Sequence, residues 1–285
     1  MHKARNFLDK GKISTLGMRL TVITINFNDA KGLEKTLDSV VDIDLSAEEV
    51  EWIVIDGGSE DNSLEVIQKH SAKITKWISE PDKGIYDAMN KGIDYATGEY
   101  IIFMNAGDCF CDLKLFSSQL SNWNDDLIYG NFISSNSKGE RKLVAQTAQL
   151  DFLYFLSKTI NHQSVFIRTK LVKKYRFDTS YSIVADWIML FNILKFENPQ
   201  IRYVNVPVCI YDTTGISSVN SQERELQKEK FLKSIYSDWE LSQLITLSRM
   251  RKKKWFNWFY HSFHRESVNF WMRFTAKIFS AIGKK

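Results

Sequence analysis

Residues 82–108 read DKGIYDAMNKGIDYATGEYIIFMNAGD, and this stretch decides the fold class. Gly84 and Gly98 bracket a predicted helix, because glycine is favoured just outside helix ends. Residues 99–104 (EYIIFM) then form a short apolar run that predicts a buried strand. The strand ends in the polar residues 105–108 (NAGD). A helix that leads into such a strand is typical of an α/β sheet with a ligand site at its edge.

The same alternation continues towards the N-terminus. Residues 20–26 (LTVITIN), 51–56 (EWIVID) and 73–79 predict strands, and residues 31–41 and 59–71 predict helices. Alternating strands and helices predict a parallel sheet, in which ligands bind beyond the carboxyl ends of the strands. Those ends carry Asn26, Asp56 and Asp108. We therefore expect the functional site there.

The second half of the chain is less regular. Strands are predicted at residues 127–132, 142–145, 162–168 and 202–210, and helices at residues 186–196 and 222–236. These patterns predict a catalytic domain over residues 18–238. It is preceded by an N-terminal arm, residues 1–17, and followed by a helical tail, residues 239–285.

The composition is that of a globular protein. Of the 285 residues, 44% are hydrophobic and 25% are charged, which excludes a disordered or collagen-like chain. Three cysteines (Cys109, Cys111 and Cys209) fit a reducing compartment better than a disulfide framework, and no second pair suggests zinc. There is no apolar run long enough for a spanning helix and no apolar core of a signal peptide in residues 1–17. These features predict a cytoplasmic protein.

Positive charge is concentrated at the C-terminus. The net charge is +4, but residues 249–285 hold ten Lys and Arg against one acid, Glu266, so the rest of the chain is net acidic. Aromatic residues recur between these cations at helical spacing, which is typical of a helix lying on an anionic membrane. Packing of the tail on the body or on a second subunit is the alternative. No nucleic acid is expected as a partner, because the body shows no basic groove or RNA-binding motif.

The nucleotide-binding motifs G-x-G-x-x-G and G-x-x-x-x-G-K-[ST] are absent, which disfavours dinucleotide oxidoreductases and P-loop NTPases. The chain instead has an ordered set of motifs: TVITINFN from residue 21, NKG-x5-GEYI-x3-NAGD from residue 90, HQSVF from residue 162 and ADWIML from residue 185. With these motifs, residues 18–220 resemble the family 2 glycosyltransferases, which have the GT-A fold. The resemblance implies a mixed α/β sheet flanked by helices, with a helical C-terminal extension. It also implies inverting transfer of a sugar from a nucleotide sugar to a hydroxyl.

By this resemblance, Thr24, Asn26 and Asp56 hold the nucleotide base, and a carboxylate that accepts the ring N–H of uracil favours a UDP-sugar. The family's acidic metal motif falls on NAGD, so only Asp108 keeps a carboxylate for Mn²⁺ or Mg²⁺. Asn105 would supply a neutral oxygen to the ribose or to a water on the metal. The alternatives are that Asp56 caps the following turn and that NAGD is a plain turn.

The family's Arg-Asn pair falls on Met89 and Asn90, so one cation near the diphosphate is missing. Lys83 and Lys91 are the expected substitutes, with a solvated surface lysine as the alternative for each.

Asp186 matches the second acid of the family's acidic pair, which is the catalytic base, and Ala185 replaces the first. Such a base takes the proton of the acceptor hydroxyl, which accelerates transfer by roughly 10²–10⁴. His162 and Gln163 match a strand on the acceptor side of the cleft. Asp186 could instead be only a helix N-cap, and His162 a core residue.

We therefore expect a peripheral enzyme on the inner face of the cytoplasmic membrane, acting on a lipid-linked saccharide in surface-polysaccharide biosynthesis. The main alternative is a non-catalytic relative that binds nucleotide sugars or glycans. A membrane scaffold without nucleotide affinity is a third interpretation.

Overall fold

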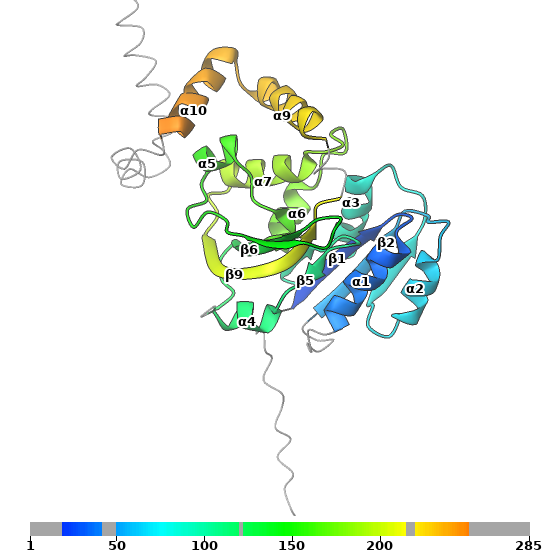
Figure 1. Cartoon of the computed structure of the whole chain (residues 1–285). Helices are drawn as coiled ribbons and strands as arrows, with labels where there is room; N and C mark the ends of the chain where they lie inside the picture. The colour runs from blue at the N-terminus through cyan, green and yellow to red at the C-terminus, as the bar shows by residue number, and fades with distance from the viewer. Residues whose placement is uncertain (1–18, 42–49, 120–121, 215–219, 251–285) are drawn as a thin grey trace, which may run out of the picture.

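The computed structural model describes residues 19–41, 50–119, 122–214 and 220–250 (Figure 1). The expected arm at residues 1–17 and residues 251–285 of the expected tail lie outside these ranges. Within the described residues, none of the helices is both long and apolar enough to cross a membrane.

The strands of the described residues belong to one sheet. They are β1 (Leu20–Asn26), β2 (Val50–Asp56), β3 (Lys76–Ser79), β4 (Tyr100–Phe103), β5 (Cys109–Phe110), β6 (Leu127–Ser135), β7 (Arg141–Val144), β8 (Val165–Arg168) and β9 (Ile201–Asp212). Their order is β3-β2-β1-β4-β8-β6-β9-β5, and β7 pairs with β6. Strands β1 to β4 are parallel, as the alternating pattern predicts, whereas β8 pairs antiparallel with β4 and β6 antiparallel with β8. The sheet is therefore mixed.

Helices cover both faces of this sheet. They are α1 (Ala30–Val41), α2 (Ser63–Lys69), α3 (Ile85–Tyr95), α4 (Leu113–Ser118), α5 (Phe152–Ser157), the short 3₁₀ helix η1 (His162–Ser164), α6 (Thr169–Tyr175), α7 (Ala185–Phe196), α9 (Ser221–Ile235) and α10 (Asp238–Met250). Figure 1 shows α1, α2 and α4 on one side of the sheet and α3, α6 and α7 on the other.

The alternation of side chains along β1 explains this layering. Leu20 and Val22 belong to the core beneath α1, α2 and α4, whereas Ile23 and Ile25 belong to the core beneath α3 and α5 to α7. Successive residues of a strand point to opposite faces, so a strand covered on both faces reads as a continuous apolar run. Helix α3 approaches β1 closely at Gly92, where a Cβ atom would lie 2.5 Å from the Ile23 side chain.

The start of the expected tail packs on the domain. Leu241, Leu244 and Leu247 of α10 are buried, and α10 contacts α5. Ser248 Oγ donates a hydrogen bond of 2.7 Å to the main-chain oxygen of Leu153 in α5. A truncation that targets the basic tail alone must therefore begin after Met250.

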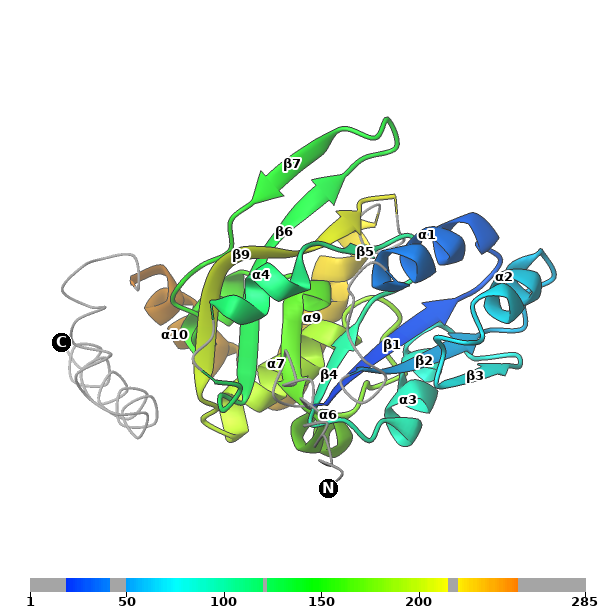
Figure 2. The ribbon, with the colours of Figure 1, turned by 90° about the horizontal axis from the view of Figure 1, so that it is seen from below.

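On another side of the molecule, β7 and the adjoining half of β6 project beyond the sheet (Figure 2).

Three predicted boundaries differ from the observed ones for local reasons. Residues 59–62 are not helical, because Ser59 turns back onto Asp56 through its main-chain N–H. The third strand begins at Lys76, after Thr75 has paired with Trp52 through both its main chain and its hydroxyl. Residues 162–164 form the 3₁₀ turn η1, and the strand starts only at Val165.

Candidate active site

The polar residues predicted from the strand ends meet at one edge of the sheet. Asn26 ends β1 and Asp56 ends the neighbouring β2, and these two residues are paired in register. Asp108 follows β4 by a short loop. Because β8 runs antiparallel to β4, the turn η1 that precedes β8 also lies at this edge. Sequence positions as distant as 26 and 162 are thereby brought together.

Asp56 is fully buried, and its carboxylate is saturated by protein donors. It accepts hydrogen bonds from Asn26 Nδ2 at 2.8 Å, from Ser79 Oγ at 2.7 Å, and from Ser59 through both the main-chain N–H and the hydroxyl. Burial alone would raise the pKa of Asp56, but these hydrogen bonds hold it below its ordinary value. Asp56 is therefore a fixed charge that braces the ends of β1, β2 and β3.

Thr24 lies inside β1 and contacts the neighbouring strand β2. Its side chain is fully buried, and its hydroxyl accepts the indole N–H of Trp52 at 3.1 Å. The residue lies two positions before the end of β1, and its contact with the nucleotide base stays a prediction.

An aromatic side chain that the sequence reading did not single out stands at this edge. Phe27, directly after β1, is 64% exposed. A Cβ atom on Gly57 would lie 3.2 Å from the Phe27 ring and 2.4 Å from Asp82 Oδ2, so ring, glycine and carboxylate adjoin. An exposed ring beside a small residue offers a surface on which a flat base can stack. An aromatic residue immediately after a buried strand was the available sequence signal.

The two candidate lysines are in different situations. Lys83 is exposed at the start of α3. Lys91 donates to the main-chain oxygen of Pro81 at 3.0 Å and pairs with Glu80 at 2.8 Å, and this hydrogen bond with Glu80 raises the pKa of Lys91. Lys91 thus ties α3 to the loop after β3. Met89, at the position of the family's arginine, is fully buried in the core.

The NAGD loop is held by α1. Gly107 has φ +93°, a conformation that favours glycine, and its N–H donates to Thr36 Oγ1 at 3.0 Å. Lys35 Nζ donates to the Gly107 main-chain oxygen at 2.6 Å. The loop is therefore a fixed structure with a cation beside it, which the sequence reading did not identify.

Asp108 is buried but less well satisfied than Asp56. Its Oδ1 accepts the main-chain N–H of Asp212 at 2.8 Å, and its Oδ2 accepts Gln163 Nε2 at 3.1 Å. Burial dominates and raises the pKa of Asp108 to about 7. A carboxylate of this kind would gain from a nearby positive charge, which would favour its ionised form.

The groups around Asp108 fit a divalent cation that takes most of its ligands from a diphosphate and from water. Asn105 Oδ1 and Gln163 Oε1 are buried oxygens without a hydrogen-bond partner. Neutral and carboxylate oxygens are the ligands that Mg²⁺ and Mn²⁺ prefer, and a diphosphate-bound cation needs only one or two from protein. Among the described residues, no three His, Cys, Asp or Glu side chains are grouped to hold a metal by themselves. The residues therefore fit a shared site, not a closed protein cage.

Asp186, in the first turn of α7, is joined to η1 and α3. His162 Nδ1 lies 2.9 Å from Asp186 Oδ2, and the hydroxyl of Tyr86 lies 3.0 Å from Asp186 Oδ1. Burial would raise the pKa of Asp186, but the hydrogen bond and charge of His162 hold it below its ordinary value, with help from the Trp187 N–H and Tyr86. The side chain keeps 21% of its surface exposed. Asp186 is thus an ionised carboxylate on a partly exposed side chain.

His162 and Gln163 connect the two carboxylates. They are consecutive residues of η1, and one contacts Asp186 while the other contacts Asp108. The sequence places both on the acceptor side but does not predict that they join Asp108 to Asp186.

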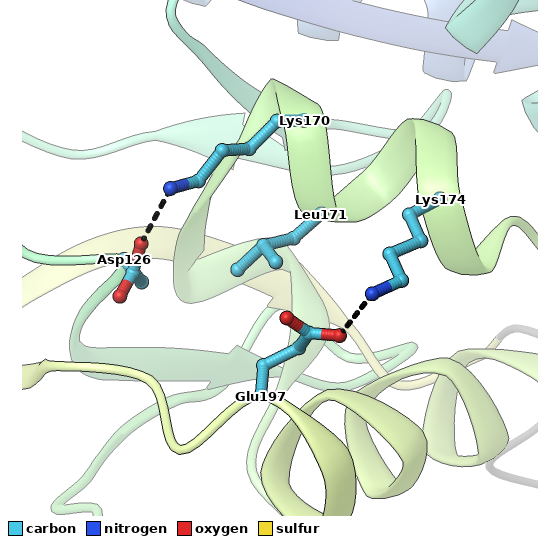
Figure 3. A pocket seen from close by; sticks show the side chains of 5 residues that line it. All are labelled: Asp126, Lys170, Leu171, Lys174 and Glu197. Carbon is cyan, nitrogen blue, oxygen red and sulfur yellow. Dashed lines mark hydrogen bonds and ion pairs between the residues drawn. The ribbon is translucent and has the colours of Figure 1, made fainter.

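A cavity of about 300 Å³ lies at the opposite edge of the sheet, lined by Asp126, Lys170, Leu171, Lys174 and Glu197 (Figure 3). Its charges are paired internally, Lys170 with Asp126 at 3.4 Å and Lys174 with Glu197 at 2.6 Å. It shares no residue with the site described above.

Comparisons with known proteins agree with this architecture. The sequence profile of Glycosyl transferase family 2 matches residues 21–218. A PGL/p-HBAD biosynthesis glycosyltransferase of Mycobacterium tuberculosis is 29% identical over 218 residues, which cover 73% of this chain and 82% of the relative. An uncharacterised glycosyltransferase of the same organism is 32% identical over 210 residues, covering 70% of this chain and 77% of the relative.

Solved structures share the fold. TarS 1–349 of S. aureus in complex with UDP superposes with a TM-score of 0.61 at 19% identity, over 89% of this chain and 78% of TarS 1–349. The mannosyltransferase PcManGT of Pyrobaculum calidifontis, in complex with GDP-Man and Mn²⁺, gives a TM-score of 0.53 at 12% identity, over 85% and 83% of the two chains. The expected GT-A-like mixed sheet flanked by helices is therefore confirmed, and the chain belongs to glycosyltransferase family 2.

Proposed function

We propose that this glycosyltransferase moves a sugar from a UDP-sugar to a saccharide hydroxyl with inversion at the anomeric carbon. The observation that carries the proposal is the pair of carboxylates, Asp108 and Asp186, joined through His162 and Gln163 at the carboxyl edge of the sheet. Asp108 is buried, accepts only two hydrogen bonds and has a raised pKa, whereas Asp186 is ionised and partly exposed. This difference suits a cation site beside a general base.

The donor lies across the strand ends in this proposal. The base stacks on the exposed ring of Phe27 near Gly57, above the network of Asn26 and Asp56. All four acceptor directions of the Asp56 carboxylate are used, but Asn26 Oδ1 is buried without a partner and can accept a ring N–H. TarS, with the same fold, has been solved with UDP and with UDP-GlcNAc, which supports uridine.

The diphosphate then reaches Asn105 and Asp108. Asn105 faces the ribose, Asp108 holds Mn²⁺ or Mg²⁺, and Lys83 is the exposed cation nearest in sequence to the N-terminus of α3. The bound cation would neutralise charge on the leaving diphosphate. PcManGT contains Mn²⁺ with its nucleotide sugar, which supports metal use.

Asp186 acts as the base. It accepts the proton of the acceptor hydroxyl while that oxygen bonds to the anomeric carbon. The bond from this carbon to the diphosphate oxygen breaks at the same time, and nucleoside diphosphate leaves. Asp186 is held for this step by His162 and Tyr86.

A panel of UDP-, GDP- and TDP-sugars, each with and without Mn²⁺, tests the donor. Stabilisation against heat and release of UDP are expected with one UDP-sugar. In Asp186→Asn, which keeps the shape but cannot accept the proton, turnover should fall by about 10²–10⁴ while the midpoint for UDP binding stays within about twofold. Loss of UDP binding in this variant would instead give Asp186 a donor-site role, and unchanged turnover would eliminate it as the base.

A non-catalytic nucleotide-sugar or glycan-binding protein is the second candidate. It is favoured by Met89, which is buried where the family has arginine, and by Asn105 and Ala106, which stand in the acidic motif. That candidate predicts heat stabilisation by a nucleotide sugar without release of nucleoside diphosphate, whether or not a saccharide is added.

For the acceptor we propose a lipid-linked saccharide at the inner face of the cytoplasmic membrane, within surface-polysaccharide biosynthesis. The named role of the mycobacterial relative in PGL/p-HBAD biosynthesis supports a glycan-building function. The ten Lys and Arg of residues 249–285 supply attraction to anionic lipid, about 1 kcal/mol for each cation near the surface.

Vesicle sedimentation tests the tail. The full chain should pellet with phosphatidylglycerol vesicles and not with phosphatidylcholine vesicles, and high salt should weaken the attachment without abolishing it. A chain ending at Met250 keeps α10 packed on α5, so it should remain folded and bind UDP yet stay in the supernatant. If the full chain ignores the anionic vesicles, the membrane proposal is wrong.

A further inference from the structure

The turn η1 makes two side-chain contacts that meet at the proposed site. His162 Nδ1 lies 2.9 Å from Asp186 Oδ2, and Gln163 Nε2 lies 3.1 Å from Asp108 Oδ2. Because the two residues are consecutive, any movement of one carries the other. Gln163 is almost fully buried, so the turn is anchored on the Asp108 side.

Three elements face the carboxylate of Asp186. Tyr86 comes from α3, His162 from η1, and Lys228 of α9 interacts electrostatically with Asp186. The Tyr86 hydroxyl has one hydrogen, yet it lies within hydrogen-bond distance of both the Ile183 main-chain oxygen, at 2.8 Å, and Asp186 Oδ1. Tyr86 can therefore donate only part of the time to Asp186, whereas the ring N–H of His162 has no competing acceptor in the hydrogen bonds of this site.

The second nitrogen of His162 distinguishes a positioning role from a catalytic one. Nε2 is buried without a hydrogen-bond partner. A proton acceptor must come within about 3.2 Å of the hydroxyl that it deprotonates, and an enclosed nitrogen cannot do so without movement of the turn. Asp186 is partly exposed. A carboxylate on Nδ1 also fixes the tautomer and the orientation of the ring.

We propose that His162 is a positioning residue, whose Nδ1–H fixes the carboxylate of Asp186 in its orientation and in its ionised form. Gln163 ties the same turn to Asp108, so η1 sets the spacing between the two carboxylates. The inference rests on the proposed function, since it assigns a role within that transfer. It goes beyond the expected acceptor-side location of His162, because it predicts an effect on turnover that is exerted through Asp186.

Two substitutions separate the N–H donor from the ring. His162→Ala removes the donor, whereas His162→Asn keeps an amide N–H close to the position of Nδ1 and has no nitrogen at the position of Nε2. With the UDP-sugar on which the wild-type chain releases UDP, His162→Ala should lower kcat by about 10- to 100-fold and change KM for the donor by less than about twofold. His162→Asn should recover most of the lost kcat.

The pH profile gives a second readout. The hydrogen bond from His162 helps to hold the pKa of Asp186 below its ordinary value, so its loss should move the acidic limb of the kcat profile to higher pH. His162→Asn should move the limb back towards the wild-type position. If His162→Asn is as inactive as His162→Ala, the imidazole itself takes part in proton transfer and the positioning role is wrong. Wild-type kcat in both variants would overturn the inference as well.

A measurement without turnover tells failure of this inference from failure of the proposed function. The losses in Tm caused by His162→Ala and Asp186→Ala should be clearly non-additive in the double variant, because each substitution removes the same contact. Additive losses would overturn the His162–Asp186 coupling whatever the activity. Non-additive losses in a chain that releases nothing from any UDP-sugar would uphold the coupling and overturn the proposed function.

Discussion

Asp56 and Asp108 are both buried carboxylates at the same edge of the sheet, yet their surroundings differ. Asp56 accepts hydrogen bonds from Asn26, Ser59 and Ser79, and its pKa lies below the ordinary value. Asp108 accepts one main-chain N–H and one amide N–H, and its pKa is raised to about 7. Burial raises the pKa of both carboxylates, and only at Asp56 do the hydrogen bonds outweigh it. The first is complete without a ligand, and the second is not.

The two carboxylates also differ in the polar groups that surround them. On the Asp56 side, the carboxylate is saturated, and Asn26 Oδ1 is a buried atom without a partner. On the Asp108 side, Asn105 Oδ1, Gln163 Oε1 and His162 Nε2 are buried without partners. Buried polar groups without partners cost free energy, about 1–3 kcal/mol each, and a ligand can recover that cost.

The largest expected effect is on the incomplete side. Asp108→Asn removes the negative charge that binds a cation. The Mn²⁺-dependent part of the UDP affinity should therefore fall by about 10- to 100-fold. Asn105→Ala, which removes only a neutral oxygen, should have a clearly smaller effect. Titration calorimetry with UDP, with and without Mn²⁺, measures both. Wild-type metal dependence in both variants would mean that the NAGD loop is not the metal site.

Asp56→Asn should act on stability. The amide places an NH₂ group opposite two donors, for example Asn26 Nδ2 and the Ser59 hydroxyl, which costs on the order of 1–3 kcal/mol in the free energy of unfolding. Urea denaturation measures this, with Glu60→Gln as a control because Glu60 is exposed at the same edge. If Asp56→Asn keeps wild-type stability but loses UDP affinity, Asp56 is the ligand-binding carboxylate and the comparison is wrong.

The two carboxylates also predict opposite pH dependences of Tm in the absence of divalent cations. Asp56 has a folded pKa below the unfolded value of 3.8, so its contribution is present at neutral pH and is lost as pH falls below about 4. Asp108 has a folded pKa near 7, above the same unfolded value, so folding favours its protonated form. Its contribution is fully present below about pH 4 and is lost as pH rises towards 7.

Substitution isolates the two slopes. Asp108→Asn should flatten the decline of Tm between pH 4 and 7, and Asp56→Asn should flatten only the decline on the acid side of pH 4. Scanning calorimetry in buffers containing a chelator records both. An unchanged profile between pH 4 and 7 in Asp108→Asn would contradict the raised pKa.

The smallest expected effect concerns the lysines. Lys83→Ala should raise KM for the UDP-sugar by a few-fold, because it removes an exposed charge beside the donor. Lys91→Ala should leave KM within about twofold and cost at most about 1 kcal/mol of stability, since it breaks a partly exposed pair with Glu80. A larger rise in KM for Lys91→Ala than for Lys83→Ala would show that Lys91 leaves Glu80 to bind the diphosphate.

Much of this edge could be predicted from the sequence, because strand ends are local features. Asp56 ends an apolar run and Asp108 follows another by a short loop, and the parallel sheet brings such ends together. The orientation of Thr24 could not be predicted, since it depends on Trp52 reaching across from the next strand. No local pattern predicts the contacts of Lys35, Tyr86 and the main chain of Asp212, because their partners lie about 70 or more positions away in the sequence.

The difference in pKa between the two carboxylates could not be predicted either, because it depends on the groups that surround each one. In the sequence, Asp56 and Asp108 look alike as acids after strands. The serines at 59 and 79 that saturate one, and the single glutamine at 163 that reaches the other, become informative only when the chain is folded.

A structure of the chain with UDP and Mn²⁺ tests the account most directly. The account predicts the uracil ring on Phe27 beside Gly57, and a cation about 2 Å from an oxygen of Asp108 that also binds the diphosphate. The carboxylate network of Asp56 should be unchanged. A diphosphate that lies away from Asp108, or a cation held by Asp56 after its hydrogen bonds to Ser59 and Ser79 have broken, would contradict it.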